Sequence, residues 1–241
     1  MNLAALIDLA RRVWTIVSSV LKKREGPIAV SSGPAFYFDR AQMARIREFR
    51  KYYAYAATVV GGMKWEALVP IHFREASLGY KVKRLGGIYQ LEPGVPADQT
   101  AEAIRKHVTE VCNRYGIAYA DIESNYHLAS VVAADELKSK AHGAMLVNGV
   151  MDEAVLADAY WGYNGRSNYH TPDGTKDPER KHWSYSPYVS NDPLRGVQFR
   201  LKGTVPDANA PGGRRHIDTL DPRPGALILY RELIQRSAEL A

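Results

Sequence analysis

One carboxylate stands out in the sequence because of the helix on which it is predicted to lie. Residues 64–78 read KWEALVPIHFREASL, and their apolar residues recur at helical spacing, with Glu75 near the C-terminal end. A carboxylate on or near an apolar face is costly to ionise, so its pKa should rise. A raised pKa keeps a carboxyl group protonated near neutral pH, as a general acid requires. Arg74 is adjacent in sequence but points elsewhere on a helix, so it need not neutralise Glu75.

The segment after this helix changes its pattern. Residues 80–93 read YKVKRLGGIYQLEP, where alternating side chains are followed by a Gly-Gly turn and then by Tyr89 and Gln90. This order predicts a short hairpin, or wing, next to the end of the Glu75 helix. Taken alone, such a glutamate is more often a surface residue than a catalyst, so further motifs are needed.

The elements that must position these residues are mostly helices. Periodic apolar residues predict helices over residues 41–60, 101–115, 121–137 and 153–163, and the Gly-Gly pair after residue 60 ends the first of them. Residues 199–207 (FRLKGTVPD) read as an extended stretch, and residues 221–229 (DPRPGALIL) as an acidic Pro-Gly turn with a closing helix. The sequence therefore predicts an α+β fold that is mostly α-helical with a small β-hairpin wing, in one domain over residues 35–241.

Residues 1–34 are expected to be a separate amphipathic helix followed by a linker. Apolar residues within residues 3–21 make one helical stripe, and residues 27–34 (PIAVSSGP) combine small residues with two prolines. The apolar run over residues 13–21 meets basic residues where a signal peptide would need a cleavage site. We therefore expect a chain made in the cytoplasm without a signal peptide, whose first helix docks on its own domain, a partner or a membrane surface.

The composition excludes several classes of protein. The chain has 241 residues, 32 Lys and Arg against 26 Asp and Glu, and one cysteine, Cys112. A single cysteine cannot form an internal disulfide, and no apolar run is long enough for a transmembrane segment. The histidines show no paired metal-ligand spacing, so no metal or other cofactor is expected. The basic excess is scattered rather than clustered, which favours an anionic partner but not nucleic acid.

Taken together, the Glu75 helix and the Gly-Gly-Ile-Tyr-Gln run resemble the catalytic region of the lysozyme-like superfamily. The helix is similar to a phage and bacterial muramidase group that reads roughly W-x-x-[IL]-x-x-I-H-[YF]-R-E-[SA]-S, and the second run to the G-x-x-Q signature of soluble lytic transglycosylases. The run after the helix lacks the H-N-G-D-P sequence usual in the phage-type group. Residues 158–165 (DAYWGYNG) resemble the later A-Y-N-x-G motif of lytic transglycosylases, and residues 183–189 (WSYSPYV) a phage-type S-P-Y-V segment.

The resemblance spans about residues 63–233 and implies a cell-wall glycosidase. It implies that Glu75 is the essential acid, that the wing lines a sugar-binding cleft, and that the tyrosine of the last motif faces Glu75. The residues implied to position the sugar are Tyr89, Gln90, Tyr163, Asn164 and Tyr188, of which Tyr89 and Tyr163 could equally be packing aromatics.

Two routes of bond cleavage stay open. Most glycosidases use a second carboxylate, for which Glu92 and Asp98 are the candidates. Without one, the resemblance implies the lytic transglycosylase route, in which the acid later serves as base on the 6-hydroxyl of the sugar. His72, three residues before Glu75, is a candidate to orient it, although a buried histidine bonded to a backbone carbonyl is the simpler reading.

The expected substrate is the β-1,4 bond between N-acetylmuramic acid and N-acetylglucosamine in peptidoglycan strands at the bacterial cell wall. Three kinds of protein would reach this substrate. They are an endolysin released by a holin, a virion or tail component, and part of a secretion complex bound through the first helix. The alternatives are a structural or wall-docking protein with a silent lysozyme-like site, and an enzyme of the chitinase or chitosanase type. Residues 166–182 form a long polar loop, which is a candidate lid or contact surface.

Overall fold

The structure of the chain is a computed structural model that describes residues 35–79, 87–89, 91, 99–141, 149–164, 182–206 and 214–240. The chain divides into two units, Met1–Ala35 and Phe36–Ala241. The helix and linker predicted over residues 1–34 lie outside the described residues. All the helices and strands named below belong to the second unit.

The second unit is mostly helical, as its periodic apolar residues predicted. Its first helix, α2 (Arg40–Val60), follows a capping box in which the Asp39 carboxylate accepts a hydrogen bond from the Gln42 N–H at 2.8 Å and the Gln42 side chain accepts one from the Asp39 N–H at 2.9 Å. Such reciprocal bonds satisfy N–H groups that have no partner inside the helix. The helix ends at Gly61, where φ is 67°.

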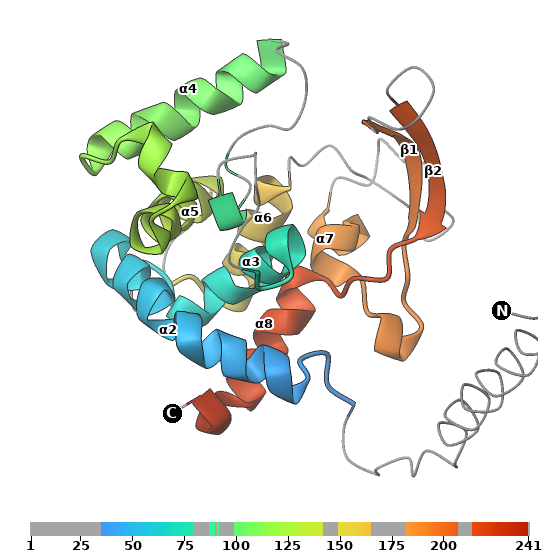
Figure 1. Cartoon of the computed structure of the whole chain (residues 1–241). Helices are drawn as coiled ribbons and strands as arrows, with labels where there is room; N and C mark the ends of the chain where they lie inside the picture. The colour runs from blue at the N-terminus through green and yellow to red at the C-terminus, as the bar shows by residue number, and fades with distance from the viewer. Residues whose placement is uncertain are drawn as a thin grey trace, which may run out of the picture. The chain divides into compact units, whose positions relative to one another are not determined.

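The helix that carries Glu75 lies in the middle of the helical body (Figure 1). A 3-10 turn, η1 (Trp65–Ala67), leads into α3 (Leu68–Ala76), which packs against α2, α5, α8 and two 3-10 turns. Most of α3 is buried, including Leu68 and Ile71. An apolar helix packed on several sides is fixed by its neighbours, so its last turn can hold a polar group in a defined place.

Of the remaining helices, α5 and α8 pack against α3, and α4 packs on the outer side of α5. The predicted helix over residues 121–137 begins later than expected, because residues 119–123 form a 3-10 turn and the Asn125 side chain caps the helix through the His127 and Leu128 N–H groups. These helices are α4 (Gln99–Arg114), α5 (Tyr126–Lys140), α6 (Glu153–Tyr163), α7 (Pro187–Ser190) and α8 (Ala226–Gln235), with 3-10 turns at Tyr119–Glu123, Trp183–Tyr185, Pro193–Arg195 and Ser237–Leu240.

The strands that the structure describes are not at the predicted wing. β1 (Arg200–Pro206) pairs antiparallel with β2 (Arg214–Leu220) in a two-stranded ribbon at one edge of the body (Figure 1). Within the predicted hairpin, residues Gly87–Tyr89 instead form a 3-10 turn, η2, and all three are buried. The predicted alternation covers residues 80–85, which lie outside the described residues together with residues 86, 90, 92 and 93 of the predicted hairpin. Among the residues that the structure describes, we find no helix long and apolar enough to cross a bilayer.

Candidate active site

Glu75 lies in the last turn of α3, where the backbone makes an unusual bend. Ser77 and Leu78 both adopt the left-handed region, with φ of 51° and 59°. Left-handed backbone is uncommon for residues other than glycine, and two in succession end the helix sharply. The bend follows directly on Glu75, whose side chain is half-buried.

The surroundings of Glu75 favour its protonated form. Burial raises the pKa of Glu75, and the Arg74 and Arg223 guanidinium groups and the Tyr188 hydroxyl offset part of that rise. The two guanidinium groups favour the ionised carboxylate, which burial disfavours. Burial thus shifts this carboxyl group towards its protonated form, and the nearby positive charges stabilise the carboxylate once the proton has been given away.

The Tyr188 hydroxyl faces this carboxyl group from α7. Hydrogen bonding to Tyr188 lowers the pKa of Glu75, and the same contact, together with burial, raises the pKa of Tyr188. Tyr188 is only 2% exposed, yet its hydroxyl has no partner of regular hydrogen-bond geometry among the described residues. The two groups are therefore close without forming a fully aligned bond. The predicted juxtaposition of Glu75 and Tyr188 is present.

A buried ion pair between Arg74 and Asp221 lies next to Tyr188. Arg74 Nη2 donates to Asp221 Oδ2 at 3.0 Å, and the two side chains are only 4% and 0% exposed. Arg74 Nη1 also donates to the carbonyl oxygens of Arg223 and Pro224 at 3.0 and 2.9 Å. The Arg74 guanidinium is bonded to Asp221 and to the backbone before α8, yet its positive charge lowers the pKa of Glu75, so the expectation that Arg74 would not act on Glu75 was wrong.

Arg223 and Asn191 complete this network. The Arg223 N–H donates to Asp221 Oδ1 at 3.0 Å, and Arg223 Nη1 donates to the Arg74 carbonyl oxygen at 3.1 Å. The Asn191 amide donates to the carbonyl oxygens of Asp221 and Arg223 at 2.7 and 2.6 Å. The bonds tie α3 to the loop before α8, so the charged groups around Glu75 are held by both segments.

Tyr163 brings a third motif into the same cluster. Its hydroxyl donates to the Tyr89 carbonyl oxygen at 3.1 Å, and the charge of Glu75 is among the causes that raise the pKa of Tyr163. The Tyr89 side chain points into the core, where its hydroxyl bonds to Ser130 at 3.0 Å. Tyr89 therefore contributes its backbone on this side, which fits a packing role for its ring.

The other predicted site residues are placed less directly. Asn164 follows Tyr163 at the C-terminal cap of α6 and is half-buried. Gln90, Glu92 and Asp98 lie outside the described residues, as does most of the predicted loop over residues 166–182. The role of Glu92 as a second carboxylate therefore stays a prediction from the sequence.

His72 does not contact Glu75 through either ring nitrogen. Nδ1 lies 2.7 Å from the Tyr53 hydroxyl and Nε2 lies 2.9 Å from the Gly79 carbonyl oxygen. These partners suit a neutral ring that accepts at Nδ1 and donates at Nε2. Burial lowers the pKa of His72 to about 4. The bond to Gly79 fixes the bend after Glu75, so any effect of His72 on Glu75 acts through the backbone.

Sequence reasoning missed the roles of Arg74, Arg223 and Asp221. Arg74 and Asp221 are 147 residues apart, and no local period marks a buried charge. The sequence held one signal of this ion pair. An arginine stands beside Glu75, and an aspartate stands in the Asp-Pro-Arg-Pro turn of residues 221–224, so two distant segments carry opposite charges.

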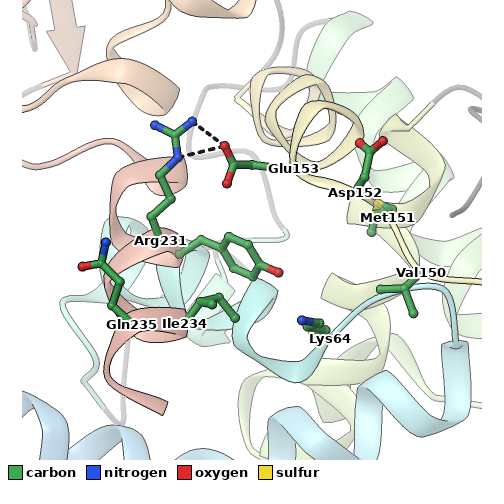
Figure 2. A pocket seen from close by; sticks show the side chains of 9 residues that line it. Lys64, Val150, Met151, Asp152, Glu153, Arg231, Ile234 and Gln235 are labelled. Carbon is green, nitrogen blue, oxygen red and sulfur yellow. Dashed lines mark hydrogen bonds and ion pairs between the residues drawn. The ribbon is translucent and has the colours of Figure 1, made fainter. Parts of the chain in front are cut away.

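A cavity of about 650 Å³ lies elsewhere on the second unit (Figure 2). It is lined by Lys64, residues 150–153 and the α8 residues Tyr230, Arg231, Ile234 and Gln235. Two of its acidic groups are already engaged: Glu153 pairs with Arg231, and Asp152 caps α6 at Val155. The cavity adjoins the start of α6, whereas Tyr163 ends that helix, about 15 Å further along.

The described residues contain no group of three or more His, Cys, Asp or Glu side chains that could hold a metal ion. Comparison of the chain with known protein families, curated proteins and solved structures finds no match.

Proposed function

We propose that this chain is a peptidoglycan-degrading glycosidase of lysozyme-like fold, in which Glu75 is the general acid and base. The bond cleaved is the β-1,4 bond between N-acetylmuramic acid and N-acetylglucosamine. The observation that carries the proposal is a half-buried carboxyl group of raised pKa, approached by Tyr188 and flanked by two guanidinium groups. The motifs that resemble muramidases and transglycosylases contribute Glu75, Tyr163 and Tyr188 to this one cluster.

The geometry fits the proton transfers that cleavage needs. Protonated Glu75 gives its proton to the leaving oxygen as positive charge develops on the sugar. The Arg74 and Arg223 charges stabilise the carboxylate that results, and this carboxylate then serves as base. Because the acid must be protonated, activity falls as pH rises through the raised pKa of Glu75.

Two observations bear on the route taken after the first step. Asp221 is fully buried and bound to Arg74 and to the Arg223 N–H, so its carboxylate is not available to activate water. The candidates Glu92 and Asp98 lie outside the described residues. The cluster is thus compatible with a transglycosylase, in which the sugar's own 6-hydroxyl attacks, and equally with a hydrolase that uses Glu92.

Release of soluble fragments from dye-labelled bacterial sacculi tests the proposal. We expect wild type to release dye, and Glu75→Gln to lose at least a hundredfold in rate while keeping the wild-type circular dichroism spectrum. Glu66→Gln is the matched control, because Glu66 lies in η1 at the other end of the same helical segment. Equal rates for wild type and Glu75→Gln would refute the proposal, and release from chitin alone would redirect it to chitin-type polymers.

In this proposal the enzyme acts at the bacterial cell wall. A phage holin, a virion or a secretion machine would deliver it there, with the predicted helix of residues 1–21 as the docking element. A truncation that lacks residues 1–23 and still joins its particle or complex would refute the docking role.

A further inference from the structure

Arg74 makes two kinds of contact that link distant parts of the site. Its guanidinium is held by the Asp221 carboxylate and by two backbone carbonyl oxygens, at distances of 2.9–3.0 Å. The centre of the same guanidinium lies 4.7 Å from the centre of the Tyr188 ring. A guanidinium can make this cation–π contact and three hydrogen bonds through its forked N–H groups at the same time, and a lysine ammonium does not reproduce that arrangement.

The Tyr188 ring is therefore packed against the Arg74 guanidinium, which is itself held in place by Asp221 and two backbone carbonyl oxygens. Tyr188 belongs to α7, a helix of four residues that is too short to orient a side chain by itself. Its hydroxyl approaches Glu75 without a regularly aligned bond. The position of that hydroxyl thus depends on what holds the ring.

We propose that Arg74 and Asp221 form a positioning pair, which fixes the Tyr188 ring and thereby holds the Tyr188 hydroxyl beside the Glu75 carboxyl group. Neither Arg74 nor Asp221 needs to touch substrate for this role. The catalytic consequence rests on the proposed function, whereas the placement of Tyr188 does not.

The charged and titratable groups that act on Glu75 come from three segments. Arg74 shares its helix, Arg223 lies in the loop before α8, and Tyr188 comes from α7. Tyr163, from α6, is in turn affected by the charge of Glu75. A test must therefore keep the charge of Arg74 while it disturbs its geometry, so that only positioning changes.

A double-mutant cycle with Arg74→Lys and Tyr188→Phe meets this condition. Arg74→Lys keeps the positive charge but loses the flat group, and Tyr188→Phe keeps the ring but loses the hydroxyl. The pKa of Glu75 is read by NMR titration of ¹³C-labelled glutamate side chains, assigned with Glu75→Gln. We expect each single variant to raise this pKa, because Tyr188 normally lowers it, and the double variant to raise it no further.

The kcat/KM for peptidoglycan cleavage should show the same non-additivity in this double-mutant cycle. We expect about a tenfold loss of kcat/KM in each single variant and no further loss in the double variant. Additive changes in the pKa of Glu75 would overturn the inference, because Arg74 would then act independently of Tyr188. If wild type leaves peptidoglycan intact while the pKa cycle is non-additive, the proposed function fails and the positioning pair stands.

Two further variants serve as a control and as a substitute in this test. Arg231→Lys makes the same substitution at an exposed arginine paired with Glu153, and it should leave the pKa of Glu75 unchanged. If Arg74→Lys does not fold, Asn191→Ala disturbs the network without a change of charge, since Asn191 holds the backbone of Asp221 and Arg223. Its effect on the pKa of Glu75 should vanish in the Tyr188→Phe background, and persistence of the effect there would overturn the inference.

Discussion

The Tyr163 hydroxyl donates a hydrogen bond to the Tyr89 carbonyl oxygen at 3.1 Å, across 74 residues of sequence. This bond joins the end of α6 to η2, so two of the motifs that pointed to a glycosidase meet at one contact. The residue after Tyr89 is Gln90, the predicted sugar-binding amide. The bond therefore fixes the segment that leads into Gln90.

Loss of this bond should affect both stability and activity. We expect Tyr163→Phe to lower the free energy of unfolding by about 1 kcal/mol, because the Tyr89 carbonyl loses its donor. Urea denaturation measures that change, and sacculus digestion should slow in parallel. Tyr115→Phe is the matched control: it removes a bond to Asp135 outside the Glu75 cluster, so it should cost stability and leave digestion unchanged. Equal slowing in both variants would contradict the assignment of Tyr163 to the site.

The buried ion pair of Arg74 and Asp221 should contribute far more to the free energy of unfolding than an exposed ion pair does. Asp221→Asn leaves Arg74 as a buried charge without its counterion, which should cost about 3–5 kcal/mol of unfolding free energy. Asp218→Asn removes the partner of Arg200 on the exposed ribbon, and its melting temperature should stay close to wild type. Calorimetry of the two variants measures the contrast, and similar melting temperatures would show that Asp221 is not structural.

His72 should make stability depend on pH. Its pKa is about 4 in the folded chain and near 6.5 when unfolded, so the unfolded state binds more protons between these values. Stability from this residue is complete above pH 6.5 and is lost as pH falls towards 4, by about 3 kcal/mol. We expect the destabilisation caused by His72→Gln, measured in urea, to shrink over that range.

The exposed His216 offers the matched substitution. His216→Gln, on β2, makes the same substitution at an exposed histidine, and its unfolding free energy at pH 7 should stay close to that of wild type. A destabilisation by His72→Gln that stays constant from pH 7 to pH 4 would contradict the buried, neutral state of His72.

Gly87 should tolerate a side chain less well than another glycine of similar backbone conformation. Both Gly87 and Gly116 have positive φ, 80° and 65°, but a Cβ on Gly87 would lie 2.5 Å from the Ile122 carbonyl oxygen, whereas one on Gly116 meets nothing within 4 Å. Alanine therefore strains the backbone at both positions and adds a clash only at Gly87. We expect Gly87→Ala to cost about 2 kcal/mol more than Gly116→Ala in denaturant unfolding. Equal costs would mean that η2 is not held against residue 122.

The sequence predicted those parts of the fold that depend on local pattern. Apolar spacing placed α2 and α6 almost residue for residue, because each has a polar cap at its start and a run of buried residues behind it. The resemblance to muramidases and transglycosylases brought Glu75, Tyr163 and Tyr188 forward as members of one site. Within the predicted wing, Gly87–Tyr89 form a 3-10 turn, and the alternating residues 80–85 lie outside the described residues.

Long-range polar contacts could not be predicted in the same way. Arg74 and Asp221 are each ordinary surface residue types, and only the fold brings them together and removes them from water. His72 was a candidate to orient Glu75 by its spacing on the helix, yet its partners come from α2 and from the bend after α3. Pairing between side chains far apart in sequence leaves no local period to detect.

Mass spectrometry of peptidoglycan products shows directly whether Glu75 cleaves glycan strands. Purified peptidoglycan is digested with wild type and with Glu75→Gln, and the soluble products are identified by mass. The account predicts glycan fragments that end in N-acetylmuramic acid from wild type alone. Anhydro ends would identify a transglycosylase, and reducing ends would identify a hydrolase with Glu92 as its first candidate base. Intact strands from both proteins, or identical fragments from both, would contradict the account.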